Sequence, residues 1–96
     1  MRKLEIINKV SSQTGIDKSD VQETVEAVLI TIKEALKNGE SVYIRGFGTF
    51  SNKKRAKKIA RNISTNTAII LDAHYTPSFK PSKIFTKLIK ENNKII

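Results

Sequence analysis

The sequence predicts an α+β fold in which two helices lead, a long β-hairpin follows and a short helix closes the chain. Three observations support this prediction. Apolar residues recur at helical spacing over residues 4–36, strand-like runs alternate with turn residues over 41–76, and a second amphipathic pattern follows residue 82. With 96 residues, 39% of them hydrophobic and none of them Cys, the chain fits one small domain without disulfides.

Two helices are expected in the first half. The first carries Leu4 and Ile7 on one face and ends at Gly15. The second is expected to be capped by the Asp17 carboxylate and to end at Gly39, a residue suited to the left-handed position after a helix. Its long apolar stripe consists of Val21, Val25, Val28, Leu29, Ile32 and Leu36.

Alternating residues then predict a small sheet. Ser41 to Ile44 alternates between the two faces of a strand, and Gly46-Phe47-Gly48-Thr49-Phe50 follows it. The glycines allow a bend or a close backbone approach, and the two Phe are expected to be core anchors. Ser82 is expected to cap the last helix.

The segment from 52 to 76 is expected to project from the body as an arm. It consists of two strand-like runs around a polar turn at 61–67, and it has no apolar stripe that could form a core. A lone two-stranded hairpin is marginally stable in water, and this one also carries many like charges. We expect it to become ordered on a polyanion. The rest of the single domain 1–96 is then a body, 1–51 and 77–90, and a frayed tail, 91–96.

The charge is unevenly distributed along the chain. Residues 1–50 hold seven basic and seven acidic side chains, whereas residues 51–96 hold eleven basic and two acidic ones, so the net charge of +9 lies entirely in the second half. One basic cluster by itself is equally well explained as a solvated surface. A neutral half joined to a strongly cationic half favours a polyanionic partner, most often nucleic acid.

The body is too small to supply a stable core alone. Without the arm, about 70 residues remain, a size at which one core rarely stabilises a fold by itself. We therefore expect a homodimer that buries the second helix and the Phe-bearing strands between subunits and places two arms symmetrically. The expected dimer core consists of Phe47, Phe50, Phe79, Val28, Leu29 and Ile32.

Three blocks of the sequence resemble the bacterial HU / integration host factor (IHF) family of histone-like DNA-binding proteins. They are Ile44-Arg45-Gly46-Phe47-Gly48-Thr49-Phe50, Ala60-Arg61-Asn62 and Pro77-Ser78-Phe79-Lys80-Pro81-Ser82-Lys83. The resemblance is collinear over about residues 3–90. It implies an intertwined homodimer or heterodimer whose two β-arms enter the minor groove of double-stranded DNA and bend the duplex. It also implies a role in DNA condensation at the bacterial nucleoid, in the cytoplasm.

The arm departs from the family pattern at three positions. Ile63 stands where the family has the tip Pro that wedges between base pairs, Asn66 replaces a turn Gly, and Asp72 replaces another common Pro. Ile is also an apolar residue that can enter a base step, so Ile63 is expected to act as the intercalating wedge. Because Ile lacks the fixed φ of Pro, the tip is expected to be less preorganised.

The candidate DNA contacts fall into two groups. The arm supplies phosphate contacts with little sequence information from Lys53, Lys54, Arg55, Lys57, Lys58 and Arg61. On one continuous strand, 53, 55, 57 and 61 would share a face. The resemblance adds Asn62 and Ile63 at the tip, and Arg45, Lys80 and Lys83 where the body meets the flanking backbone. Lys87 and Lys3 are secondary candidates.

Two alternatives to an architectural protein of low sequence specificity stay open. One is a sequence-selective bender like integration host factor, which Arg45 and the Pro77-Ser78-Phe79-Lys80-Pro81 stretch favour. Such selectivity depends on DNA deformability, which lies outside the protein sequence. The other is an RNA-binding, ribosome-associated protein, which the basic half would also fit. No catalytic or metal site is expected, since His74 is the single His and no carboxylate cluster surrounds it. An enzyme, a cofactor and a small-molecule ligand are therefore not expected. A membrane partner is not expected either, because the longest unbroken apolar runs are four residues, Ala27 to Ile30 and Ala68 to Leu71.

Overall fold

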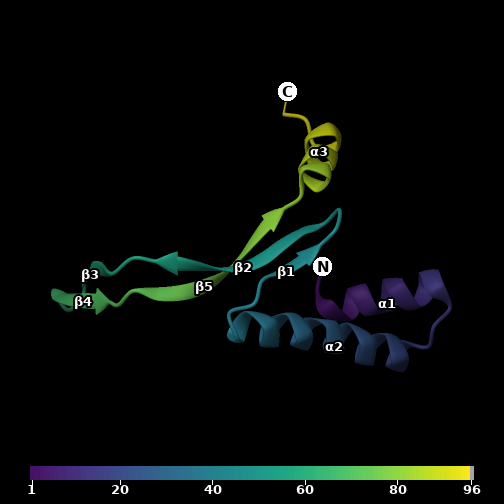
Figure 1. The fold of residues 1–96 in the computed structure, drawn as a ribbon, viewed down its shortest axis with the longest axis horizontal. Coiled ribbons are helices and arrows are strands. Elements are labelled where there is room, and N and C mark those ends of the chain that lie inside the picture. The colour runs from purple at the N-terminus through teal and green to yellow at the C-terminus, as the bar shows by residue number, and fades with distance from the viewer. Residues whose placement is uncertain (96) are drawn as a thin grey trace.

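The computed structural model describes residues 1–95 as three helices and five strands (Figure 1). In chain order they are α1 (Lys3–Thr14), α2 (Lys18–Lys37), β1 (Val42–Ile44), β2 (Gly48–Arg55), β3 (Lys58–Asn62), β4 (Thr67–Leu71), β5 (His74–Pro81) and α3 (Lys83–Asn92). The α+β order expected from the sequence is confirmed, and Ile96 lies outside the described residues.

Helices α1 and α2 form an antiparallel pair that ends at the two expected glycines. Gly15 adopts φ 75° and donates its amide to Ser11 O at 2.9 Å, and Gly39 adopts φ 80°. The expected side-chain cap at Asp17 is wrong. The carboxylate accepts a hydrogen bond of 2.7 Å from the Ser19 hydroxyl instead of one from a backbone amide of the first turn.

Strands β1, β2 and β5 form one antiparallel sheet in the order β1-β2-β5. The register pairs Ile44 with Gly48 and Phe50 with Phe79. Gly46 turns the chain at φ 78°, and Gly48 is buried where a Cβ would lie 2.5 Å from Lys80 O. The two glycines therefore have the separate roles that the sequence indicated, a bend and a close approach.

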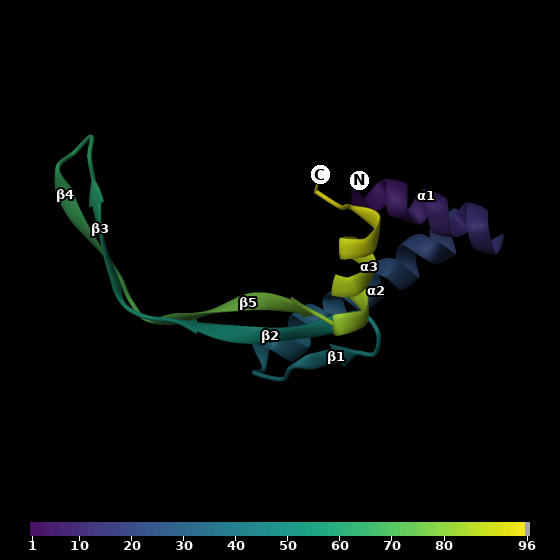
Figure 2. The same ribbon diagram turned by 90° about the horizontal axis from the view of Figure 1, so that it is seen from above.

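The long hairpin is divided into two ribbons in series. The proximal ribbon is the β2–β5 ladder, which ends at Arg55 and His74, and the distal ribbon is the β3–β4 ladder, which begins at Lys58 and Leu71. Figure 2 shows the distal ribbon turning away from the proximal one at this break. At the break, the His74 ring Nδ1 is hydrogen-bonded to the Asp72 backbone oxygen at 2.8 Å. Asp is a residue type that disfavours strands, in keeping with the interruption of the ladder at this point.

A single chain buries very little of its apolar surface. Among residues 1–95, only two hydrophobic side chains, Ile7 and Val21, are buried, with 2% and 3% exposed. The radius of gyration is 18.9 Å, whereas a compact domain of this length would have about 12.5 Å. The arm and the isolated position of α3 account for this open shape (Figure 1).

The last helix joins the body through an aromatic cluster. Ser82 caps α3 as expected, accepting a hydrogen bond from the Phe85 amide at 3.1 Å. The Phe85 ring centroid lies 5.3 Å from that of Phe47, which in turn lies 5.1 Å from Phe79. Helix α3 continues to Asn92, two residues into the segment that the sequence assigned to the tail.

Gly48→Ala should lower the free energy of unfolding by about 2–3 kcal/mol, because the added methyl overlaps a backbone oxygen and the Phe79 ring. Gly39→Ala is the matched control, since a Cβ there meets no atom within 4 Å and only the positive φ costs about 1 kcal/mol. Urea unfolding at one fixed protein concentration measures both. Equal losses in the two variants would contradict the close-approach role of Gly48.

Candidate nucleic-acid interface

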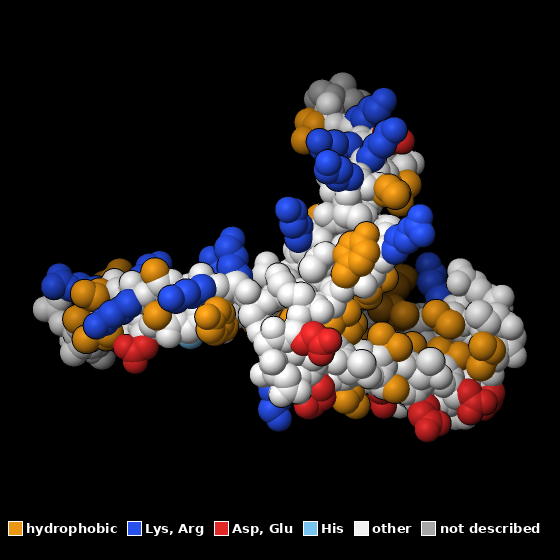
Figure 3. Space-filling model, in the orientation of Figure 1, with side chains coloured by type: hydrophobic (Ala, Val, Ile, Leu, Met, Phe, Trp, Pro, Cys, Tyr) orange, Lys and Arg blue, Asp and Glu red, His pale blue; other side chains and the backbone are white. Residues whose placement is uncertain are grey.

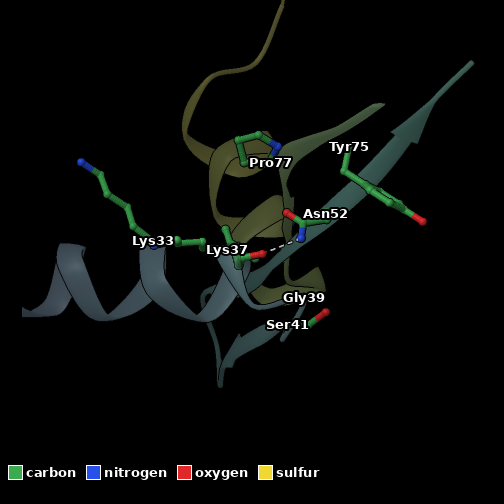
Figure 4. Close-up of a pocket in the computed structure, with 8 residues that line it drawn as sticks. Lys33, Lys37, Gly39, Ser41, Asn52, Tyr75 and Pro77 are labelled. Atoms are coloured by element: carbon green, nitrogen blue, oxygen red, sulfur yellow. Dashed lines mark hydrogen bonds between the residues drawn. The ribbon is translucent and has the colours of Figure 1, made fainter. Parts of the chain in front are cut away.

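The base of the arm is fastened to the end of α2. The Asn52 amide Nδ2 donates a hydrogen bond of 2.7 Å to Leu36 O, which also accepts from the Gly39 amide at 3.0 Å at the end of the helix (Figure 4). Asn52 and Tyr75 from the arm, together with Pro77 and Gly39 from the body, line a groove of about 730 Å³. This contact fixes where the proximal ribbon leaves the body.

The six predicted arm cations are all exposed and follow the whole length of the arm. Lys53, Lys54 and Arg55 lie on β2, Lys57 lies in the break, and Lys58 and Arg61 lie on β3. The predicted common face for 53, 55, 57 and 61 is wrong, because the strand ends at Arg55 and alternation restarts at Lys58. The side-chain alternation on β2 therefore does not determine which face of the distal ribbon carries Lys58 and Arg61.

The tip of the arm presents one apolar side chain to solvent. The Asn62 carboxamide Oδ1 accepts hydrogen bonds from the Ser64 amide at 3.1 Å and the Ser64 hydroxyl at 2.8 Å, which closes the turn locally. Asn66, which replaces a turn Gly, takes the left-handed conformation at φ 52°, a conformation that Asn adopts more readily than most residues other than Gly. Ile63 lies between them with 92% of its surface exposed.

Three predicted body cations come from neighbouring elements. Arg45 lies in the β1–β2 turn, Lys80 near the end of β5, and Lys83 at the start of α3. The Ser82 amide donates to Phe47 O at 2.9 Å, so the β1–β2 turn and the start of α3 are joined directly. The structure thus brings these three cations to one end of the sheet, at the opposite end of β2 from the distal ribbon.

Lys3 is already paired within the helical body. Its ammonium donates a hydrogen bond of 2.9 Å to Glu26 on α2. This hydrogen bond, together with one from the Gln22 amide, holds the pKa of Glu26 below its ordinary value. A phosphate would have to replace that carboxylate, which sets Lys3 apart from the cations of the arm.

Positive and negative side chains gather on different parts of the molecule. In the face shown in Figure 3, Lys and Arg line the arm and α3, and Asp and Glu lie along the α1–α2 pair. The sequence analysis did not single out Lys90, which shares a groove with Lys80, Lys83 and Lys87. The signal was present, because 83, 87 and 90 recur at helical spacing.

The predicted dimer-core residues form a partly covered apolar surface. Val28 and Leu29 on α2 are 51% and 44% exposed, although they belong to its apolar stripe. Phe47 and Phe79 are also exposed, whereas Phe50 and Ile32 are half-buried. A single chain leaves such a surface open to water, and covering it with a second chain would supply the missing core.

The described part of the chain offers no group of three His, Cys, Asp or Glu residues able to hold a metal ion. Within residues 1–95, no helix is both long and apolar enough to cross a membrane.

Residues 1–90 match the family described as bacterial DNA-binding protein. The chain belongs to this family, that of HU and integration host factor. It is 43% identical over 90 residues to the SPbeta prophage-derived DNA-binding protein HU 2 of Bacillus subtilis, which covers 94% of this chain and 98% of the relative. It is 39% identical over 98 aligned positions to integration host factor subunit beta of a Marinomonas species, covering 99% and 96%.

Solved structures of the HU family share the fold. The Anabaena HU–DNA cocrystal structure superposes with a TM-score of 0.86 at 28% identity, covering 99% of this chain and all of that one (100%). HU from Thermotoga maritima superposes with a TM-score of 0.67 at 32% identity, covering 94% of this chain and 100% of that one. The resemblance inferred from the three sequence blocks is confirmed.

If a second chain covers the exposed apolar surface, stability must depend on protein concentration. A tenfold increase in concentration should raise the free energy of unfolding by about 1.4 kcal/mol, with a corresponding rise of the thermal midpoint. Calorimetry over a concentration series, with light scattering for the mass, measures this. A midpoint that does not move, together with the mass of one chain, would contradict the shared core.

Proposed function

We propose that this HU-family protein is an architectural double-stranded DNA-binding protein that binds as a dimer through its β-arms. The arms enter the minor groove, bend the duplex and compact DNA with low sequence specificity. The observation that carries this proposal is the form of the arm itself: a narrow two-stranded extension with exposed cations along its length and a bare apolar residue at its tip.

The arm suits a nucleic-acid groove because of what it lacks. Its distal ribbon has no covering layer, so β3 and β4 expose side chains on both faces. Six cations repel one another unless phosphates neutralise them, and a duplex places phosphates along both walls of its groove. Contacts of this kind carry little sequence information, which accounts for the low specificity.

The dimer gives the two arms a fixed relation to each other. The HU/IHF family forms dimers, including heterodimers in integration host factor. The exposed α2 stripe and the Phe cluster supply the surface for a second chain, with Val28, Leu29, Ile32, Phe47, Phe50 and Phe79 as the proposed core. Two arms on one core can hold the same duplex at two points, which a bend requires.

The body is proposed to hold the DNA that flanks the arms. Arg45, Lys80 and Lys83 lie at the end of the sheet away from the distal ribbon and are free to contact phosphates. This function needs no catalytic step, cofactor or small-molecule ligand, and its expected location is the bacterial nucleoid in the cytoplasm. No observation on the described residues favours a sequence-selective bender or an RNA-binding protein.

Duplex affinity should fall steeply with salt. If the dimer neutralises ~8 phosphates, the slope of log K against the logarithm of the salt concentration should be about −7. Lys53→Gln/Lys58→Gln removes four cations per dimer and should make the slope shallower by about 4. Lys9→Gln/Lys18→Gln removes the same charge from the helical body and should leave the slope nearly unchanged. Gel shifts over a salt series measure all three, and a flat dependence for the unmodified protein would overturn the proposal.

Ile63→Ala should reduce DNA bending and leave the fold and the salt slope intact, because it removes the wedge and no phosphate contact. Unstacking one base step costs a few kcal/mol that the apolar side chain offsets. Ile63→Pro is the companion variant, expected to bend at least as strongly since its φ is fixed. End-to-end energy transfer on a labelled duplex measures the bend. An unchanged bend in Ile63→Ala would contradict the wedge role.

A further inference from the structure

We infer that the free edge of β4 pairs with β4 of a second dimer when no DNA is bound, and that a duplex competes with this pairing. The pairing joins two distal ribbons into one sheet in the strand order β3-β4-β4-β3. The competition by DNA rests on the proposed function. The pairing itself goes beyond that function and follows from the backbone, the side chains and the charges of the distal ribbon.

Strand β4 has one edge that pairs with no other strand within residues 1–95. Strands β3 and β4 form a two-stranded sheet, so each has one neighbour and one free edge. A free edge presents a row of unpaired backbone N–H and C=O groups to any chain that approaches it. All five residues of β4 are exposed, and Figure 2 shows the distal ribbon standing clear of the helices and of the three-stranded sheet. A second chain can therefore reach this edge without any change in the body.

The side chains of β4 favour strand pairing. The strand reads Thr-Ala-Ile-Ile-Leu, and Ile69, Ile70 and Leu71 are 44%, 59% and 45% exposed. Residues 62–71 contain no charged side chain, Pro or Gly, whereas natural edge strands avoid pairing by means of charges, Pro or bulges. A two-stranded ribbon is marginally stable alone, and more strands with an apolar face stabilise it. Pairing along β4 supplies both the strands and the cover.

The cations of the arm select β4 over β3 as the pairing edge. Strand β3 carries Lys58 and Arg61, both exposed. Pairing through two β3 edges would place these cations on strands about 4.8 Å apart. In a sheet paired through β4, the two β3 strands are the outer ones and lie about 14 Å apart. This exceeds the Debye length of about 8 Å at physiological ionic strength, so salt screens most of the repulsion.

The sequence of β4 is complementary to itself in an antiparallel pair. The register that pairs all five residues has its twofold axis at Ile69, which then lies opposite Ile69 of the second copy. Ala68 lies opposite Ile70 and Thr67 opposite Leu71 in the same register. Cross-strand pairs of β-branched residues stabilise such a sheet. Because a dimer carries two arms, the contact can repeat and form chains of dimers.

An arm held in a minor groove has no room for this partner. The outer strands of the paired sheet lie about 14 Å apart, whereas the minor groove is about 6 Å wide. DNA binding and arm pairing are therefore alternatives. They also respond to salt in opposite directions, because salt weakens phosphate contacts and screens the repulsion between paired arms.

Ile69→Lys tests the pairing because it places two ammonium groups opposite each other at the twofold axis. Ile59→Lys is the matched control, since it adds the same charge to the same ribbon on the outer strand β3. Sedimentation velocity without DNA, over a series of protein concentrations, should show assemblies larger than the dimer for the unmodified protein and the control. Ile69→Lys should weaken the association about tenfold. A dimer at every concentration in the unmodified protein, or equal weakening in both variants, would overturn the inference.

A charge swap at the twofold axis tests the register and guards against a ribbon that is merely unfolded by the new charge. Ile69→Glu alone should associate as weakly as Ile69→Lys alone. An equimolar mixture of the two should recover the large assemblies, because a carboxylate then faces an ammonium group across the axis. A mixture that stays dimeric would count against the pairing and overturn the inference.

Salt separates arm pairing from attraction between a cationic arm and the acidic helices of another dimer. Raising the salt concentration from about 0.05 M to about 0.5 M should strengthen the association of the unmodified protein, because the arm cations are screened. An ion-pair contact would weaken over the same range. Weaker association at high salt would assign the assembly to the helices and overturn the inference.

Amide hydrogen exchange locates the contact. The amides of β4 that face the free edge should gain about tenfold protection as the protein concentration rises, while those of β3 should not change. Excess duplex should convert the assemblies into DNA-bound dimers, and assemblies that persist on duplex through β4 would overturn the competition. Failure of the proposed function would look different, because the protein would then assemble without DNA and show no salt-dependent binding to duplex.

Discussion

The exposed apolar faces of α2, the sheet and α3 impose the constraint on which the rest of the structure depends. Two hydrophobic residues buried among residues 1–95 are far too few to balance the entropy of ordering such a chain. The chain must therefore share its core with a second copy or a close relative. Once the core is shared, two arms, two sheet ends and two α3 helices stand in a fixed arrangement, and the DNA-binding surface becomes a property of the pair.

The same constraint determines the composition of the arm. Residues that pack against a partner are concentrated in the body, so the arm is left with cations, short polar side chains and a few exposed aliphatic ones. Its ordering depends on the local hydrogen bonds of Asn62 and Ser64 at the tip and on the Asn52 contact to Leu36 at its base. Between these two points the ladder is interrupted, so the distal ribbon can turn relative to the body without disturbing the core.

Much of this arrangement could be predicted from the sequence because the signals were local. Helical spacing, the glycines at 15 and 39 and the Ser82 cap each depend on a few adjacent residues. The Asp17 cap failed because a competing hydroxyl two residues away took the carboxylate, which a capping pattern does not weigh. The break at residues 56–57 and 72–73 was missed because alternation over a charged segment has no core face to fix its phase.

The candidate site was predictable in composition and less so in extent. A run of Lys and Arg between residues 53 and 61 is visible to any charge count, whereas the α3 lysines are separated along the chain and meet only when the helix is formed. Nor could the sequence show that the Lys3 ammonium is paired with Glu26, since that contact joins two helices. The effect of a charge in this protein depends on its placement: a lysine with no carboxylate nearby is available to a phosphate, whereas Lys3, beside Glu26, joins the two helices of the body.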